Sequence, residues 1–181
     1  MKIKQIILLL SAIVFILLLS IFIVVNKTTK DSNQDTSLIK LSKEEISEIK
    51  LIYPDEVINL SRTSPTSSWY LLPEKVTGNE FEINMFLSEI DDLSADRVIK
   101  DIPKNQLGLI TTSLVIEIIN FSGQKLQCII GDENPLKTGS FVQIVDERKP
   151  LSSTDKDKET YIIAKYKISR LKKQKQDFLL I

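Results

Sequence analysis

The chain has 181 residues, enough for one domain beside an anchor, and its 24 lysine and arginine residues balance its 24 aspartate and glutamate residues. This neutrality argues against a nucleic-acid partner, because nucleic-acid binders need a basic face that displaces counterions from phosphates. Histidine is absent and Cys128 is the single cysteine, so Cys–His catalysis, histidine ligation of a metal and an intrachain disulfide are excluded.

The first 25 residues predict a membrane anchor. Ile6–Val25 reads IILLLSAIVFILLLSIFIVV, and at about 1.5 Å per residue this run covers roughly 30 Å, the hydrocarbon thickness of a bilayer. The run is too long for a cleaved signal, and no small-residue cleavage site follows it. We predict an uncleaved, single-pass cell-membrane anchor with an extracytoplasmic C-terminal domain. Lysines on both sides of the run leave its orientation open on charge alone.

Residues 26–37, NKTTKDSNQDTS, contain no apolar side chain and predict a hydrated polar linker. The domain is then expected over residues 38–181. Its pattern predicts short strands, with turns at Pro, Gly and Asn, in two groups around a helix. The expected strands are Ile46–Tyr53, Val57–Ser61, Trp69–Leu72, Ala95–Ile102, Ser113–Asn120, Lys125–Gly131, Phe141–Val145 and Thr160–Ala164.

Two segments change to helical spacing. From Asn79 to Leu93, apolar residues recur every three or four positions, with Asn79 as the expected cap and acidic residues in the first turn. Lys165–Gln174 alternates basic and apolar residues at helical spacing. The predicted class is therefore α+β, a compact, sandwich-like body with a mainly antiparallel sheet and two inserted helices, preceded by one transmembrane helix.

Candidate sites for chemistry have ordinary structural interpretations. Asp132, Glu133 and Asn134 are metal-ligand types without the spacing of a calcium loop, so we interpret them as a strand connection. Asp91 and Asp92, with Asp96, could form a carboxylate pair, but are more typical of a solvated helix end. We predict no catalytic, cofactor-binding or metal-binding residue and no cofactor.

Three further features also have two interpretations. The S-x-x-K pattern of a serine–lysine dyad occurs five times, which deprives it of meaning in a chain rich in both residues. Trp69 could stack on a ligand but is expected in the core. The basic segment Lys165–Lys175 could lie on anionic lipid, although a solvated helix face is favoured. The five S-x-x-K pairs are Ser37/Lys40, Ser47/Lys50, Ser122/Lys125, Ser153/Lys156 and Ser169/Lys172.

The order of motifs resembles the bacterial domain-of-unknown-function family 4340 (DUF4340). The resemblance runs over most of the chain after Ser42 and implies an extracytoplasmic, membrane-tethered α+β domain. Some family members resemble accessory parts of ABC-type export or gliding-motility complexes, and no catalytic residues carry over. The matching boxes are the strand Ile46–Leu51, Trp69 to Pro73, Leu93 to Val98, Leu107-Gly108-Leu109, Leu126–Gly131, Tyr161–Ile163 and the terminal DFLLI.

We therefore predict a non-enzymatic, membrane-anchored interaction module, an accessory subunit of an ABC-type export or envelope complex with an unidentified membrane-protein partner. The alternative is a small-ligand domain for glycan or lipid, which requires an apolar pocket with convergent polar groups. A hydrolase that uses carboxylates or serine–lysine is the third hypothesis.

Overall fold

A computed structural model of the chain describes residues 37–99, 102–109, 114–148 and 159–180. These residues belong to one compact unit, Ser37–Ile181. The predicted anchor Ile6–Val25 and residues 26–36 of the predicted linker lie outside the described residues, whereas Ser37, the last residue of that predicted linker, belongs to the compact unit. Within the described part of the chain, no helix combines the length and the apolar character needed to cross a membrane.

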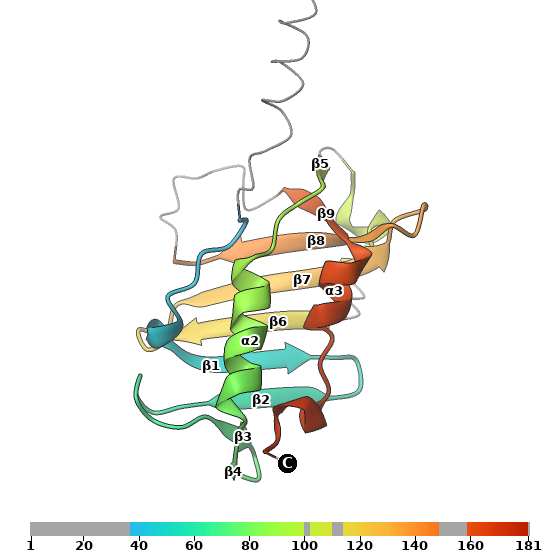
Figure 1. Ribbon diagram of the computed structural model, residues 1–181. Helices are drawn as coiled ribbons and strands as arrows, with labels where there is room; N and C mark the ends of the chain where they lie inside the picture. Colours follow the sequence, from blue (N-terminus) through green and yellow to red (C-terminus); the bar gives the residue numbers. More distant parts are fainter. Residues whose placement is uncertain (1–36, 100–101, 110–113, 149–158, 181) are drawn as a thin grey trace, which may run out of the picture. The chain divides into compact units, whose positions relative to one another are not determined.

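Within these ranges, nine strands form one sheet in which every neighbouring pair is antiparallel (Figure 1). The chain does not follow the sheet in order, because β1 pairs with both β2 and β6, and β5 pairs with β9. From one edge to the other the strands are β4 (Val76–Thr77), β3 (Tyr70–Leu72), β2 (Val57–Ser61), β1 (Ile46–Ile52), β6 (Leu114–Asn120), β7 (Lys125–Glu133), β8 (Gly139–Asp146), β9 (Thr160–Ala164) and β5 (Arg97–Ile99).

Two α-helices cover one face of this sheet, α2 (Glu80–Asp91) and α3 (Lys165–Leu171) (Figure 1). This arrangement confirms the predicted α+β class. The predicted sandwich-like body consists of one sheet covered by a layer of helices and not of two packed sheets. Asn79 caps α2 as predicted, since its side-chain oxygen accepts from the Phe81 and Glu82 amides at 3.1 and 3.3 Å. Short 3-10 turns complete the fold: η1 (Lys43–Glu45), η2 (Lys104–Gln106) and η4 (Lys175–Phe178).

The main core lies between the helices and the sheet. Alternate strand residues such as Ile49 and Leu51 face it, and α2 contributes the buried side chain of Phe86, whose ring meets Phe178 edge-on with centroids 5.6 Å apart. Trp69 is only 2% exposed, which confirms its predicted place in the core. The apolar residues that recur at helical spacing and those that alternate along the strands therefore pack against each other in this one core.

A second, smaller core lies on the other face of the sheet. Because side chains alternate along a strand, Phe141 points away from the face that Val142 gives to the main core. Phe141 packs there with Leu107 and Leu109. The turn that carries these leucines is held against the sheet by a bond from the Asp132 amide to the Leu107 carbonyl, 3.1 Å long.

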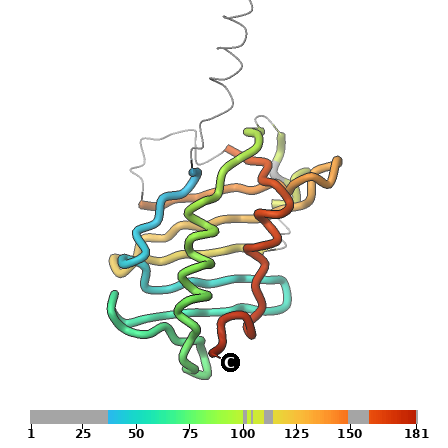
Figure 2. Tube along the Cα trace, in the orientation of Figure 1, coloured from blue at the N-terminus to red at the C-terminus, as the bar shows by residue number. Residues whose placement is uncertain are grey.

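The segment that leads into β1 runs beside α2 (Figure 2). We call Ser37–Lys43 the strap. Its Leu38 amide donates to the Leu93 carbonyl at 2.8 Å, and its Leu41 amide donates to the Asp91 carboxylate at 2.7 Å. Between these bonds Ile39 is inserted into the core and is 1% exposed. The strap is therefore an integral part of the domain.

Candidate functional site

The acidic residues around the end of α2 do not form a catalytic pair in the described part of the chain. The Asp91 carboxylate accepts the Leu41 amide, so it holds the strap. Asp92 and Asp96 are exposed, and no hydrogen bond or ion pair joins the three carboxylates within the described ranges. The structure thus gives Asp91 a local structural role.

Of the predicted connection Asp132–Asn134, only Asn134 lies between β7 and β8, because Asp132 and Glu133 are the last two residues of β7, which runs two residues beyond the expected end. The Asn134 side-chain oxygen accepts from the Thr138 amide at 2.9 Å and from the Gly139 amide at 3.3 Å, which fixes the turn. Glu133 lies 2.7 Å from the Lys165 ammonium group, whose hydrogen bond lowers the pKa of this carboxyl. These polar groups therefore shape a turn and its exposed rim.

The four serines of the S-x-x-K pattern that the structure describes, Ser37, Ser47, Ser122 and Ser169, are hydrogen-bonded to nearby groups and not to their lysines. The Ser47 hydroxyl donates to the Ile119 carbonyl at 3.1 Å, the Ser122 hydroxyl donates to the Asn120 side chain at 2.8 Å, and the Ser169 hydroxyl donates to the Tyr166 carbonyl at 2.7 Å. Ser153/Lys156 lies outside the described residues. The remaining nucleophile type, the Cys128 thiol, is fully buried, and burial raises its pKa to about 12.

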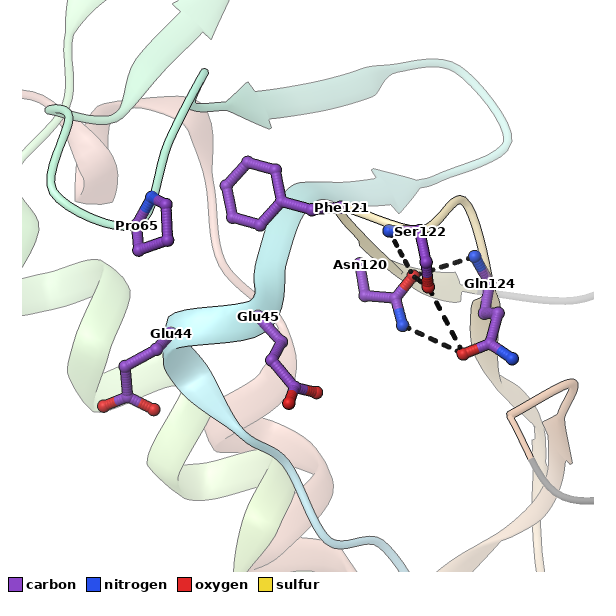
Figure 3. Close-up of a pocket in the computed structure, with 7 residues that line it drawn as sticks. All are labelled: Glu44, Glu45, Pro65, Asn120, Phe121, Ser122 and Gln124. Carbon is purple, nitrogen blue, oxygen red and sulfur yellow. Dashed lines mark hydrogen bonds between the residues drawn. The ribbon is translucent and has the colours of Figure 1, made fainter.

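Among the described residues, one surface hollow has a volume of about 480 Å³, and we call it the groove (Figure 3). This volume is within the range of about 300–1,000 Å³ that small-ligand sites occupy. Three elements form its walls: η1, the loop between β2 and β3, and the turn between β6 and β7. Its lining residues are Glu44, Glu45, Pro65, Asn120, Phe121, Ser122 and Gln124.

Arg62 fastens the walls of the groove to one another. Its guanidinium donates to the Ile46 carbonyl at 2.8 Å, to the Pro65 carbonyl at 3.0 Å and to the Lys43 carbonyl. Its guanidinium carbon also lies 4.7 Å from the centroid of the Trp69 ring and 5.9 Å from that of the Phe121 ring. Burial lowers the pKa of Arg62, and the carboxylates of Glu44 and Glu80 oppose that shift. The Arg62 side chain thus joins η1, the start of β1 and the β2–β3 loop at the groove.

Phe121 forms the apolar part of the groove. Its amide donates to the Glu45 carbonyl at 2.9 Å, which ties the β6–β7 turn to η1. Its ring is directed toward Pro65 and is 42% exposed (Figure 3). A single exposed apolar side chain is common on protein surfaces. Phe121 differs in that its backbone is bonded to η1 and its ring lies beside Arg62 at the groove.

The polar side chains of the β6–β7 turn are bonded among themselves. The Asn120 side-chain oxygen accepts from the Gln124 amide at 2.8 Å and from the Ser122 hydroxyl, while its side-chain nitrogen donates to Gln124 at 3.1 Å (Figure 3). Glu44 and Glu45 extend together on one side of the Phe121 ring in the same view. The groove therefore combines an apolar floor, an acidic side and a polar wall whose bonding capacity is largely used.

A second hollow, of about 630 Å³, lies where the end of α3 and η4 meet the start of α2. It is mixed in charge, since Arg170 and Lys172 line it together with Glu82 and Asp177. Arg170 is engaged with Glu89 at 3.3 Å. This hollow belongs to the basic segment for which lipid contact and a solvated face are the two interpretations, and its charges are partly balanced within the protein.

Sequence reasoning did not identify the groove. Arg62 and Pro65 stand in a stretch with the composition of an ordinary loop, and Phe121 appears only as the first residue of a predicted turn. An aromatic residue inside such a turn is the one signal that could have indicated an exposed ring. No family model, curated protein or solved structure matches this chain.

Proposed function

We propose that this chain is a membrane-anchored, non-enzymatic interaction module, an accessory subunit that holds its extracytoplasmic domain beside a membrane-protein partner. The apolar run Ile6–Val25 supplies the anchor in this proposal, and the resemblance to DUF4340 supports an ABC-type export or envelope complex as the setting. The observation that carries the proposal is the exposed Phe121 ring in a groove that Arg62 holds rigid.

The physical reason is that exposed aromatic rings on a fixed scaffold are typical of protein interfaces. Aromatic residues are enriched at the centre of such interfaces, where they add buried area at a small cost in side-chain entropy. Phe121 needs no rearrangement to be presented, because its backbone is bonded to η1 and its ring has the Arg62 guanidinium 5.9 Å from its centroid. A partner would therefore meet a surface that is already ordered.

The small-ligand alternative draws support from the volume of the groove, which would admit part of a glycan or lipid. Specific recognition of a glycan requires polar groups that converge on it. The polar groups of the β6–β7 turn are instead bonded to one another, and the nearby carboxylates extend beside the Phe121 ring. The geometry therefore favours a protein partner over a glycan.

The proposal is tested by crosslinking the full-length protein in cells, extracting it in mild detergent and identifying the copurified chains. Phe121→Asp should remove a specific membrane-protein partner, whereas Phe81→Asp, at a ring that is 68% exposed on α2, should leave it in place. Full-length protein that is recovered only as a monomer, with no crosslinked partner, would refute the proposed function.

A further inference from the structure

The groove has an apolar floor beside an acidic side, and these two surfaces together select the chemistry of the partner group that it can receive. The inference drawn from them rests on the function proposed above. We propose that the groove receives a lysine or arginine side chain, presented on an extended segment of the partner protein. The apolar stem of that side chain would cover Phe121 and Pro65, and its charged end would reach the carboxylates of Glu44 and Glu45.

The acidic side of the groove is not neutralised by contacts in the described part of the chain. Glu44 and Glu45 are both exposed, and neither makes a salt bridge to any described residue. Other glutamates on this surface do find cations; for example, Glu48 lies 3.2 Å from Lys50. Two adjacent carboxylates that have no salt-bridge partner among the described residues therefore border an apolar floor.

Three cations lie close to this acidic side, and the donors of each are directed elsewhere. Arg62 donates to three backbone carbonyls, as described above. Arg148 makes a two-bond contact with the Asp146 carboxylate, at 2.7 and 2.9 Å. Lys43 donates to the Ser88 hydroxyl at 2.6 Å. Their charges reduce the local field, but the hydrogen bonds that they make go to other groups of the described residues and not to the carboxylates of Glu44 or Glu45.

The shape of a basic side chain matches this division. Lysine and arginine carry an apolar stem and a charged end, so they cover hydrophobic surface while the charge stays at its edge. A cation beside an exposed ring gains further attraction from the ring's negative face. Each exposed ion pair adds little on its own, so the stem contact and the two carboxylates act together.

The test uses the full-length protein in detergent micelles and the peptide acetyl-Lys-Lys-Lys-amide, with acetyl-Glu-Glu-Glu-amide as the opposite-charge probe. Trp69 is the only tryptophan of the chain and touches Arg62, so its emission reports on the groove while both peptides are silent. Calorimetry gives an independent affinity. We expect the basic peptide to bind, the acidic peptide not to bind, and the affinity to fall as salt rises.

Variants then locate the contact. The double change Glu44→Gln and Glu45→Gln should weaken the basic peptide by about tenfold, and Phe121→Ala should weaken it to a similar degree. The matched control is Asp55→Asn with Glu56→Gln, an adjacent and exposed acidic pair at the other end of β1, which should leave the affinity unchanged. Thermal midpoints establish that every variant is folded.

Three results would overturn the inference: no binding of the basic peptide, equal binding of the two peptides, or equal losses from the two acidic pairs. The crosslinked partner separates this inference from the proposed function. A partner that remains bound to the Glu44→Gln/Glu45→Gln protein and is lost from the Phe121→Asp protein would refute the basic side chain and retain the interaction module. No partner with the wild-type chain would refute both.

Discussion

A single methyl group at Gly131 tests how the second core is built. A β-carbon at this position would overlap the Leu107 carbonyl oxygen and would lie 3.1 Å from a methyl carbon of Leu109 and 3.2 Å from the Gly108 carbonyl carbon. The nearest obstacle is backbone, so relief requires the turn to separate from β7. Overpacking of this kind costs about 1–3 kcal/mol. Loss of the bond from the Asp132 amide to Leu107 adds about 0.5–1.5 kcal/mol.

We therefore expect Gly131→Ala to lower the free energy of unfolding by roughly 2–4 kcal/mol, or the thermal midpoint by roughly 5–12 °C. Urea denaturation of the full-length protein in detergent, followed by Trp69 fluorescence, measures the loss. Gly123→Ala is the control, because no atom lies within 4 Å of its added carbon and only its φ of +81° opposes the change. That control should cost about 1–2 kcal/mol. A loss below about 0.5 kcal/mol at Gly131 would mean that the turn is not seated on β7.

Three further changes probe other contacts of the same domain. Arg62→Lys keeps the charge but cannot reach three carbonyls, so it should lower the unfolding free energy by about 1–3 kcal/mol in urea titrations; an unchanged midpoint would remove Arg62 as the fastener of the groove. Asp91→Ala should cost about 1–2 kcal/mol through the lost bond to Leu41, whereas Asp92→Ala should cost less than about 0.5 kcal/mol, and equal effects would contradict the assigned contact. Burial raises the pKa of the Cys128 thiol from 9.0 to about 12. The stability that this adds is therefore complete below pH 9.0 and should be lost as the pH rises toward 12, and Cys128→Ala should flatten that loss in urea titrations at several pH values.

Much of the fold follows from local patterns in the sequence. Alternation in ISEIKLI and LVIEIIN marks β1 and β6 because each strand has one face in the main core. Asn79 and the apolar spacing after it mark α2 for the same reason. The end of α3 is less visible, because Lys172 leaves the helical conformation at a position where basic residues continue without a break. Helix propensity gives no stop signal there.

The order of strands and the groove depend on contacts between distant residues. The pairing of β1 with β6, and of β5 with β9, depends on which apolar faces of distant strands pack together. The residues next to each strand in the sequence do not indicate these pairings. The two-residue strand β4 forms only because β3 is there to receive it. The groove arises where Arg62 meets Phe121, residues from separate loops, so its composition could be seen in the sequence while its assembly could not.

The strap has a mechanical consequence. Any tension that travels along the chain toward Ser37 reaches α2 first, through the Leu38 and Leu41 amides and the inserted Ile39 side chain. The Leu38 bond, the buried Ile39 side chain and the Leu41 bond lie between Ser37 and β1, so a load arriving at Ser37 meets these contacts before it meets the sheet. The strap, rather than a strand of the sheet, is thus the part of the domain that would bear such a load first.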